Sequence, residues 1–101
     1  MRLVTRGNMD GLCCAVFITE CEDIESIALI HPQDITDRRF TVHQGDILAN
    51  VPYDSRCTKW FDHHAATRTY TQPPEQFEGK YGLTQSSARL VYQYYIDKNP
   101  A

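Results

Sequence analysis

The chain has 101 residues, 42% of them hydrophobic, and a net charge of −3, which suits one small globular domain or part of one. The acidic balance, with no Lys/Arg cluster, provides no electrostatic footprint for nucleic acid. No segment approaches the roughly 18 apolar residues that a membrane span needs. The N-terminus has no room for the hydrophobic region of a signal peptide, so we expect a cytoplasmic location.

The four cysteines fit a reducing compartment as reduced, buried thiols. Cys13 and Cys14 are adjacent, and the sequence contains no Cys-x-x-Cys pair. A structural zinc site is therefore not expected.

The first half of the chain predicts a strand, a helix and a second strand. Residues 3–5 are apolar, and residues 6–11 combine turn-forming glycines with an acidic residue that suits the start of a helix. Apolar residues recur at helical spacing from about residue 10 to residue 21. Residues 26–31 form a continuous apolar run, which is typical of a strand buried in a parallel sheet.

The second half of the chain is less regular. Residues 46–51 and 58–61 predict two further buried strands, and residues 40–42 could pair briefly as another. Residues 65–82 are expected to form a loop.

A final helix follows, which Ser86 or Ser87 can cap. The alternation of strands and helices predicts an α/β fold with a small, mainly parallel sheet flanked by helices.

Polar residues follow three of the predicted strands, where ligands collect in open parallel sheets. These positions are residues 6–11, Asn50 and residues 62–64. Asp46 begins its strand, so it should lie about 13 Å from Asn50 at roughly 3.3 Å per residue. We therefore do not expect Asp46 to share a ligand with Asn50.

Residues 62–64 have the sequence Asp-His-His, a combination of side chains that can bind a metal ion. A carboxylate with imidazole nitrogens suits Mn²⁺, Fe²⁺, Co²⁺ or Zn²⁺, and Mg²⁺ less well. An ion held in this way can polarise a phosphoryl oxygen and acidify a bound water. An isolated Asp-His-His tripeptide is usually just solvated, so the surrounding motifs decide its interpretation.

The motifs, taken in order, resemble those of the DHH phosphoesterase superfamily. The matching segments are Asn8-x-Asp10-Gly11, Asn50-Val51-Pro52-Tyr53, Trp60-Phe61-Asp62-His63-His64 and Ser86-Ser87-Ala88-Arg89-Leu90-Val91-Tyr92. The resemblance covers nearly the whole chain and is closest to bacterial proteins related to exopolyphosphatase. It implies a metal-dependent hydrolase of phosphoanhydride or phosphodiester bonds. It also implies that residues 1–101 are an incomplete N-terminal DHH-type domain, without the C-terminal part that grips substrate.

The resemblance gives each residue of the Asp-His-His motif a role. His63 is implied as a metal ligand and His64 as a catalytic residue that faces the phosphate. Asp62 is implied as a metal ligand or as a catalytic partner that orients the site.

The resemblance also shows where the chain departs from the family pattern. Arg6 stands where the family has a histidine, and Asn8 stands at the first aspartate of the following pair. Asn50 stands at the aspartate that bridges two metal ions. Only Asp10 keeps its carboxylate.

These replacements change the charge that a metal site would have. Two divalent ions 4 Å apart repel each other by on the order of 16 kcal/mol at an effective dielectric constant of 20, and a neutral amide offsets little of this. We therefore expect at most one cation, held by Asp10, His63 and Asp62, with Asn8 and Asn50 as weak neutral ligands. Mn²⁺ is the expected ion, with Mg²⁺ as an alternative.

Two other interpretations of the same residues remain open. Arg6, the following turn, the helix N-terminus and His64 could bind a phosphate without a metal. Alternatively, Arg6 could pair with Asp10 or Asp62 in a domain that kept its fold and lost its chemistry, as a non-catalytic binding or oligomerisation module. The expected ligand is a phosphate-containing small molecule or polyphosphate. An incomplete domain would also expose an apolar edge, which favours a homo-oligomer.

Overall fold

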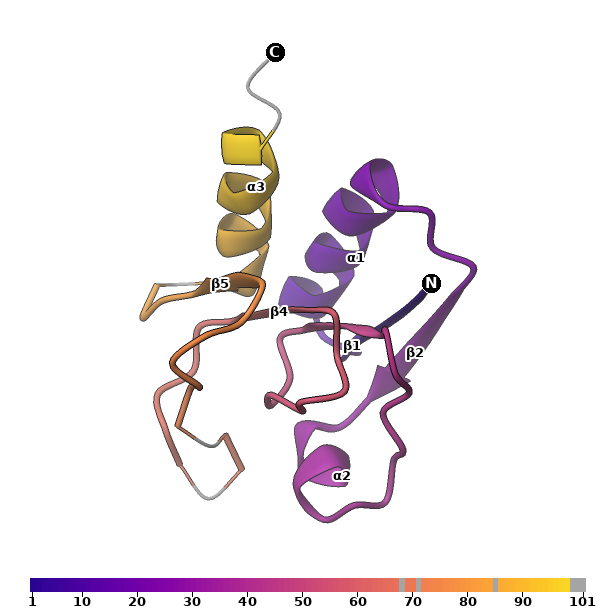
Figure 1. Ribbon diagram of the computed structural model, residues 1–101, viewed down its shortest axis with the longest axis vertical. Coiled ribbons are helices and arrows are strands. Elements are labelled where there is room, and N and C mark those ends of the chain that lie inside the picture. Colours follow the sequence, from indigo (N-terminus) through magenta and orange to yellow (C-terminus); the bar gives the residue numbers. More distant parts are fainter. Residues whose placement is uncertain (68, 71, 85, 99–101) are drawn as a thin grey trace.

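The computed structural model describes residues 1–67, 69–70, 72–84 and 86–98, and it shows an α/β fold (Figure 1). The elements in chain order are β1 (Arg2–Arg6), α1 (Met9–Cys21), β2 (Ser26–Ile30), α2 (Pro32–Thr36), β3 (Ile47–Ala49), β4 (Lys59–Asp62), β5 (Gly79–Tyr81) and α3 (Ser87–Lys98). The strands form one five-stranded sheet in the order β2-β1-β3-β4-β5, and every pair is parallel. The predicted fold class is confirmed.

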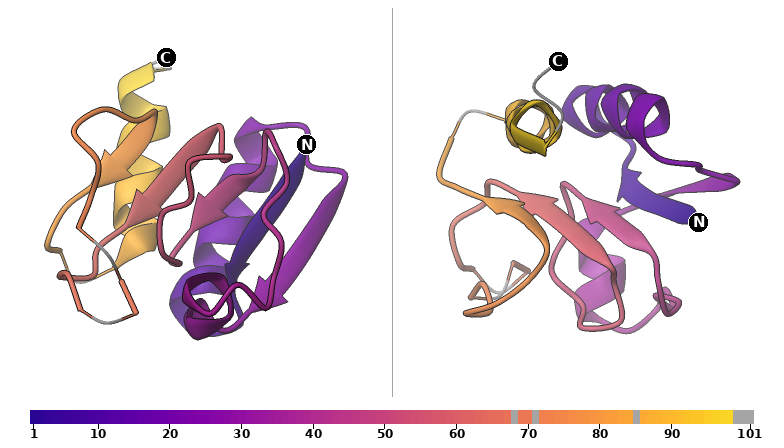
Figure 2. Two further views of the ribbon diagram at one scale, coloured as in Figure 1. Left: turned by 60° about the horizontal axis from the view of Figure 1, so that its bottom comes forward. Right: turned by 45° about the horizontal axis from the view of Figure 1, so that its top comes forward.

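Helices cover the sheet on both faces (Figure 2). Helices α1 and α3 pack on one face, over a core of Leu3, Cys14, Ala15, Ile18, Ile47, Ala49, Phe61, Ala88, Val91 and Tyr94. Helix α2 and the long loops cover the other face, over a core of Val4, Ile35, Val42, Leu48, Val51 and Trp60. Because neighbouring residues of β1, β3 and β4 point into different cores, the ends of these three strands are fixed from both sides.

Several predicted elements differ from the structure. Residues 40–42 form no strand; the ordered element in this part of the chain is the short helix α2, which His31 caps through its side chain. Strand β5 was not predicted, because three residues are too few to show a periodic pattern. It depends on Gly79, which has φ 129° and lies so close to β4 that a Cβ would be 1.9 Å from the Trp60 carbonyl oxygen.

The turn between β1 and α1 brings the start of the helix unusually close to the end of the strand. Asn8 is the N-cap of α1, and its side chain accepts a hydrogen bond from the Gly11 N–H. A Cβ on Gly11 would lie 1.8 Å from the Arg6 carbonyl oxygen, so only glycine allows the helix to start this near the strand end. The turn therefore brings the N-terminus of α1 directly over the C-terminal edge of the sheet.

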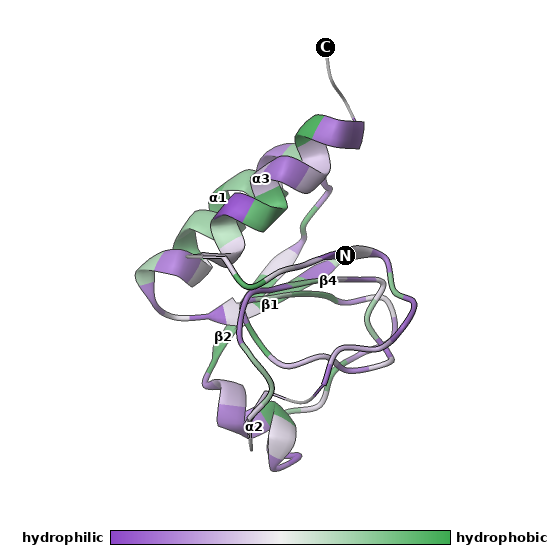
Figure 3. Cartoon of the chain, turned by 90° about the vertical axis from the view of Figure 1, so that its left-hand side faces the viewer, coloured by the Kyte–Doolittle hydropathy of each residue, from purple (hydrophilic) through white to green (hydrophobic). Residues whose placement is uncertain are grey.

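Some apolar side chains remain exposed along α1, α3 and the edge strand β2, and Figure 3 shows hydrophobic segments on these helices. The exposed side chains include Leu12, Val16, Phe17, Ile27, Leu29, Tyr92 and Ile96. Self-association through them stays a prediction. In the described ranges, no helix has both the length and the apolar character to cross a bilayer.

Candidate functional site

The structure brings the polar residues from three strand ends together at one edge of the sheet. The Asn50 side chain, after β3, donates from Nδ2 to Oδ1 of Asn8, after β1, at 3.1 Å. His63, after β4, has its Nε2 atom 3.4 Å from Oδ2 of Asp10 in the first turn of α1. Residues more than forty positions apart in the sequence are therefore direct neighbours.

His64 is held in one orientation by its surroundings. Its Nδ1 atom lies 2.7 Å from Oδ1 of Asp62, which is only 1% exposed. Its ring stacks on Tyr70 with centroids 3.8 Å apart, and the Tyr81 hydroxyl donates to its backbone carbonyl. Burial raises the pKa of Asp62, and the hydrogen bond and charge of His64 oppose this shift. Because Nδ1 is engaged, Nε2 is the ring atom left for a ligand.

Arg6 lies beside the same tyrosine. Burial raises the pKa of the Tyr70 hydroxyl, and the charge of Arg6 acts in the opposite direction. Arg6 also lines a cavity of about 430 Å³ together with Gly7, Asn8, Leu29, Ile30, His31 and Asp34. Tyr70 thus links the two residues that were predicted to contact phosphate. Sequence reasoning missed this role, because Tyr70 lies in a loop without periodicity.

Asp10 closes the N-terminus of α3. Its Oδ2 atom accepts the Ser87 N–H at 2.8 Å, and its Oδ1 atom accepts the Ala88 N–H at 2.9 Å. His63 Nδ1 lies 2.9 Å from the Thr84 carbonyl oxygen, which can only accept, so Nδ1 carries a proton. The Nε2 atom of His63 is therefore the one that faces Asp10.

Asn8 and Asn50 are joined to a residue that the sequence marked only as a possible helix cap. Asn8 Oδ1 accepts from the Gly11 N–H as well as from Asn50. Ser87 Oγ donates to Asn50 Oδ1 at 3.1 Å. Ser86 provides the helix cap instead, since its Oγ accepts the Arg89 N–H.

A metal ion fits these residues poorly. In the part of the chain that the structure describes, no group of three or more His, Cys, Asp and Glu side chains could hold a metal. The predicted set is divided, because Asp62 is turned to His64 and both oxygens of Asp10 accept hydrogen bonds from α3. Asp10 and His63 alone are fewer than the three protein ligands typical of catalytic metal sites. A resident ion, Mn²⁺ or Mg²⁺, stays a prediction that this arrangement does not support.

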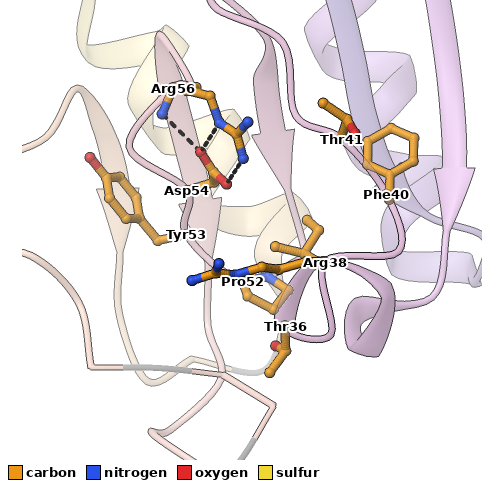
Figure 4. A pocket seen from close by; sticks show the side chains of 9 residues that line it. Thr36, Arg38, Phe40, Thr41, Pro52, Tyr53, Asp54 and Arg56 are labelled. Carbon is orange, nitrogen blue, oxygen red and sulfur yellow. Dashed lines mark hydrogen bonds and ion pairs between the residues drawn. The ribbon is translucent and has the colours of Figure 1, made fainter.

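A second cavity, of about 450 Å³, lies beside α2 and contains none of the predicted site residues. Apolar side chains such as Phe40 and Pro52 line it together with charged ones (Figure 4). Asp54 and Arg56 point toward each other there, with Oδ2 and Nη2 2.8 Å apart. The histidine pair lies outside this cavity, so we place the candidate chemistry at the strand ends.

No family model matches the chain, and neither does any curated protein. Among solved structures, the chain is similar to the pGpG-specific phosphodiesterase PggH from Vibrio cholerae, with a TM-score of 0.76 and 34% sequence identity. The chain resembles part of a phosphodiesterase. The match covers 93% of this chain and 29% of that one. It supports a phosphoesterase-like domain and the relationship to DHH phosphoesterases that the motifs indicate. Closeness to exopolyphosphatases stays a prediction.

Proposed function

We propose that the chain is a phosphoesterase-like domain that binds a phosphate-containing ligand between Arg6 and His64 and takes part in its hydrolysis. The main observation behind this proposal is the fixed orientation of the His64 ring. Buried Asp62 fixes Nδ1 and Tyr70 stacks on the ring, which leaves Nε2 for a phosphoryl oxygen or a water. Arg6, which lies close enough to Tyr70 to act on its hydroxyl, supplies a permanent positive charge that suits phosphate.

The proposed reaction is attack by water on phosphorus. A water oxygen forms a bond to phosphorus, and the bond from phosphorus to the leaving oxygen breaks. His64 Nε2 accepts a proton from the water and returns it to the leaving oxygen, while Asp62 stabilises the charged ring. Arg6 stabilises the negative charge on the phosphoryl oxygens.

The proposed substrate contains a phosphodiester or a phosphoanhydride bond. PggH is specific for pGpG, and this supports a short nucleotide with a phosphodiester bond as the substrate of the chain. The sequence resemblance to exopolyphosphatase-related proteins supports polyphosphate or pyrophosphate as the alternative.

The test is a hydrolysis assay with pGpG, pyrophosphate and polyphosphate, each in EDTA, Mg²⁺ and Mn²⁺. His64→Gln should lower the rate by about 100-fold or more, the usual size of a general acid–base contribution, and Arg6→Gln by about 100-fold or more through loss of electrostatic stabilisation. His43→Gln, a change at an exposed histidine far from the site, should leave the rate unchanged. Equal rates in wild type and His64→Gln would refute the proposed role of His64.

A second candidate is a binding module that does not turn over its ligand. It is favoured by Asp10, whose two oxygens are both used to hold α3, and by the neutral side chains of Asn8 and Asn50. Calorimetric titration with pGpG separates the two functions. Binding that depends on His64, with no product formed under any ion condition, would support the binding module.

A further inference from the structure

Asn50 uses every polar group it has, although it is only 1% exposed. Its backbone N–H donates to a carbonyl at the end of β4, and its backbone carbonyl accepts a tyrosine hydroxyl. Its side chain bonds to the N-cap of α1 and to the first residue of α3. The four partners are Phe61 O at 2.8 Å, Tyr70 Oη at 3.2 Å, Asn8 Oδ1 at 3.1 Å and Ser87 Oγ at 3.1 Å.

We propose that Asn50 is a metal-independent hub that holds the C-terminal edge of the sheet and the N-termini of α1 and α3 together. In this view, hydrogen bonds between neutral side chains hold these elements together in place of a cation bound between carboxylates. The inference follows from the poor fit of a metal ion to these residues, and it does not depend on the proposed hydrolysis.

The backbone fixes the direction of this hydrogen-bond chain. The Gly11 N–H can only donate, so the Asn8 atom that it contacts, Oδ1, must accept. A group that also faces Asn8 Oδ1 must therefore be a donor, and the Asn50 amide nitrogen is one. The Ser87 hydroxyl then donates to the remaining Asn50 oxygen. An ionised aspartate at position 50 has no proton to give to Asn8.

The backbone at Asn50 is compatible with this role. Its φ of 62° is in the left-handed region, which asparagine adopts more readily than most residues. This conformation directs the Asn50 side chain toward Asn8 and Ser87 while its backbone bonds to Phe61 and Tyr70.

Both carboxylates at this edge have hydrogen-bond partners without a cation. The Asp10 carboxylate receives two N–H groups from the positive end of the α3 dipole. The Asp62 carboxylate is paired with His64. Arg6 adds a positive charge to the same edge, which further disfavours a divalent ion.

The first test compares Asn50→Asp with the matched change Asn8→Asp by thermal unfolding of the chain in EDTA. Asn50→Asp places an acceptor against the acceptor of Asn8 and should lower the midpoint by roughly 5–15 °C. Asn8→Asp should leave it nearly unchanged, because aspartate is an equally good N-cap and still accepts from Asn50.

The second test adds the metal ions themselves. The wild-type midpoint should be the same in EDTA, Mg²⁺ and Mn²⁺, because an ion stabilises a fold only by binding to it. The double variant with aspartate at positions 8 and 50 should be the least stable in EDTA, and Mn²⁺ should raise its midpoint. If Asn50→Asp does not fold, Ser87→Ala serves instead, with an expected loss of roughly 4–8 °C.

Nuclear magnetic resonance provides a readout that stability alone does not. The side-chain NH₂ signals of Asn50 should be protected from exchange and should stay sharp when paramagnetic Mn²⁺ is added. Selective broadening of these signals, or a wild-type midpoint that rises in Mn²⁺, would overturn the proposal. Equal loss of stability in Asn8→Asp and Asn50→Asp would overturn it as well.

Discussion

The two edges of the sheet give their buried polar groups different partners. At the edge where the strands begin, the Asp46 carboxylate is 2% exposed and is neutralised by Arg2, with Nη2 and Oδ2 2.6 Å apart. The same carboxylate accepts the His43 N–H. At the edge where the strands end, the Asp62 carboxylate is 1% exposed and bonds to His64, and the buried Asn50 amide bonds to the amide of Asn8.

Strand β1 shows the difference within five residues, because it begins and ends with an arginine. Arg2 is committed to Asp46, and its Nη2 atom also donates to the Thr41 carbonyl. Within the described residues, Arg6 makes no ion pair with a carboxylate. One edge is therefore closed by charge pairing. The other is held by the amide bonds of Asn50 and by the two hydrogen bonds that Asp10 accepts from α3, which leave Arg6 and the Nε2 atom of His64 for a ligand.

The largest expected effect is at the turn that closes the C-terminal edge. Gly11→Ala should destabilise the chain by about 3 kcal/mol or more, because its Cβ would overlap the Arg6 carbonyl and move α1 away from β1. Gly7→Ala is the matched control, since a Cβ there meets nothing closer than 3.8 Å. Urea unfolding measures both variants. Similar losses in the two would mean that the close approach at Gly11 is not what holds this edge.

The next effect breaks the charge pair at the N-terminal edge. Arg2→Ala should cost about 3 kcal/mol, because it leaves the buried Asp46 carboxylate without its partner. Arg56→Ala removes an arginine from an exposed pair with Asp54 and should have a much smaller effect in the same unfolding experiment. If both arginines matter equally, burial does not distinguish the two pairs.

A smaller effect is expected where Asp10 caps α3. Asp10→Ala should cost about 2 kcal/mol, because the N–H groups of Ser87 and Ala88 lose their charged acceptor. Asp10→Asn should cost less, since an amide oxygen still accepts one of the two bonds. Circular dichroism during thermal unfolding checks both changes, and equal stability of wild type and Asp10→Ala would exclude the capping role.

The smallest expected effects are differences in the reactivity of the cysteine thiols near the two edges. Burial raises the pKa of Cys14, near Asp10, and raises that of Cys57, near Asp46, to about 11. At pH 8 iodoacetamide should therefore modify exposed Cys21 first and Cys14 only after unfolding.

Peptide mass spectrometry can follow the modification of each thiol separately, so it reports on the two edges independently. In Asn50→Asp, Cys14 should become reactive while Cys57 stays slow, because only the C-terminal edge is loosened. Rapid modification of Cys14 in the wild-type chain would contradict the packing of α1 on the sheet.

The sequence predicted which residues lie at which edge. Hydrophobic periodicity and turn residues placed residues 6–11, Asn50 and residues 62–64 at the ends of strands, and they placed Asp46 at the start of one. The structure agrees, since Asp46 pairs with Arg2 away from the site. Strand β5 and helix α2 were missed, because their formation depends on contacts with β4 and on a local cap more than on their own patterns.

The parallel fold and the set of polar residues at the strand ends could be predicted from the amino-acid pattern alone, because both follow from local periodicity. How those residues pair depends on contacts between distant parts of the folded chain. Asp10 bonds to the backbone of Ser87, 77 positions away, and Tyr70 stacks on His64 from a loop. A hydrogen bond depends on the position and direction of both partners, and no local pattern records these for residues that meet only when the chain has folded.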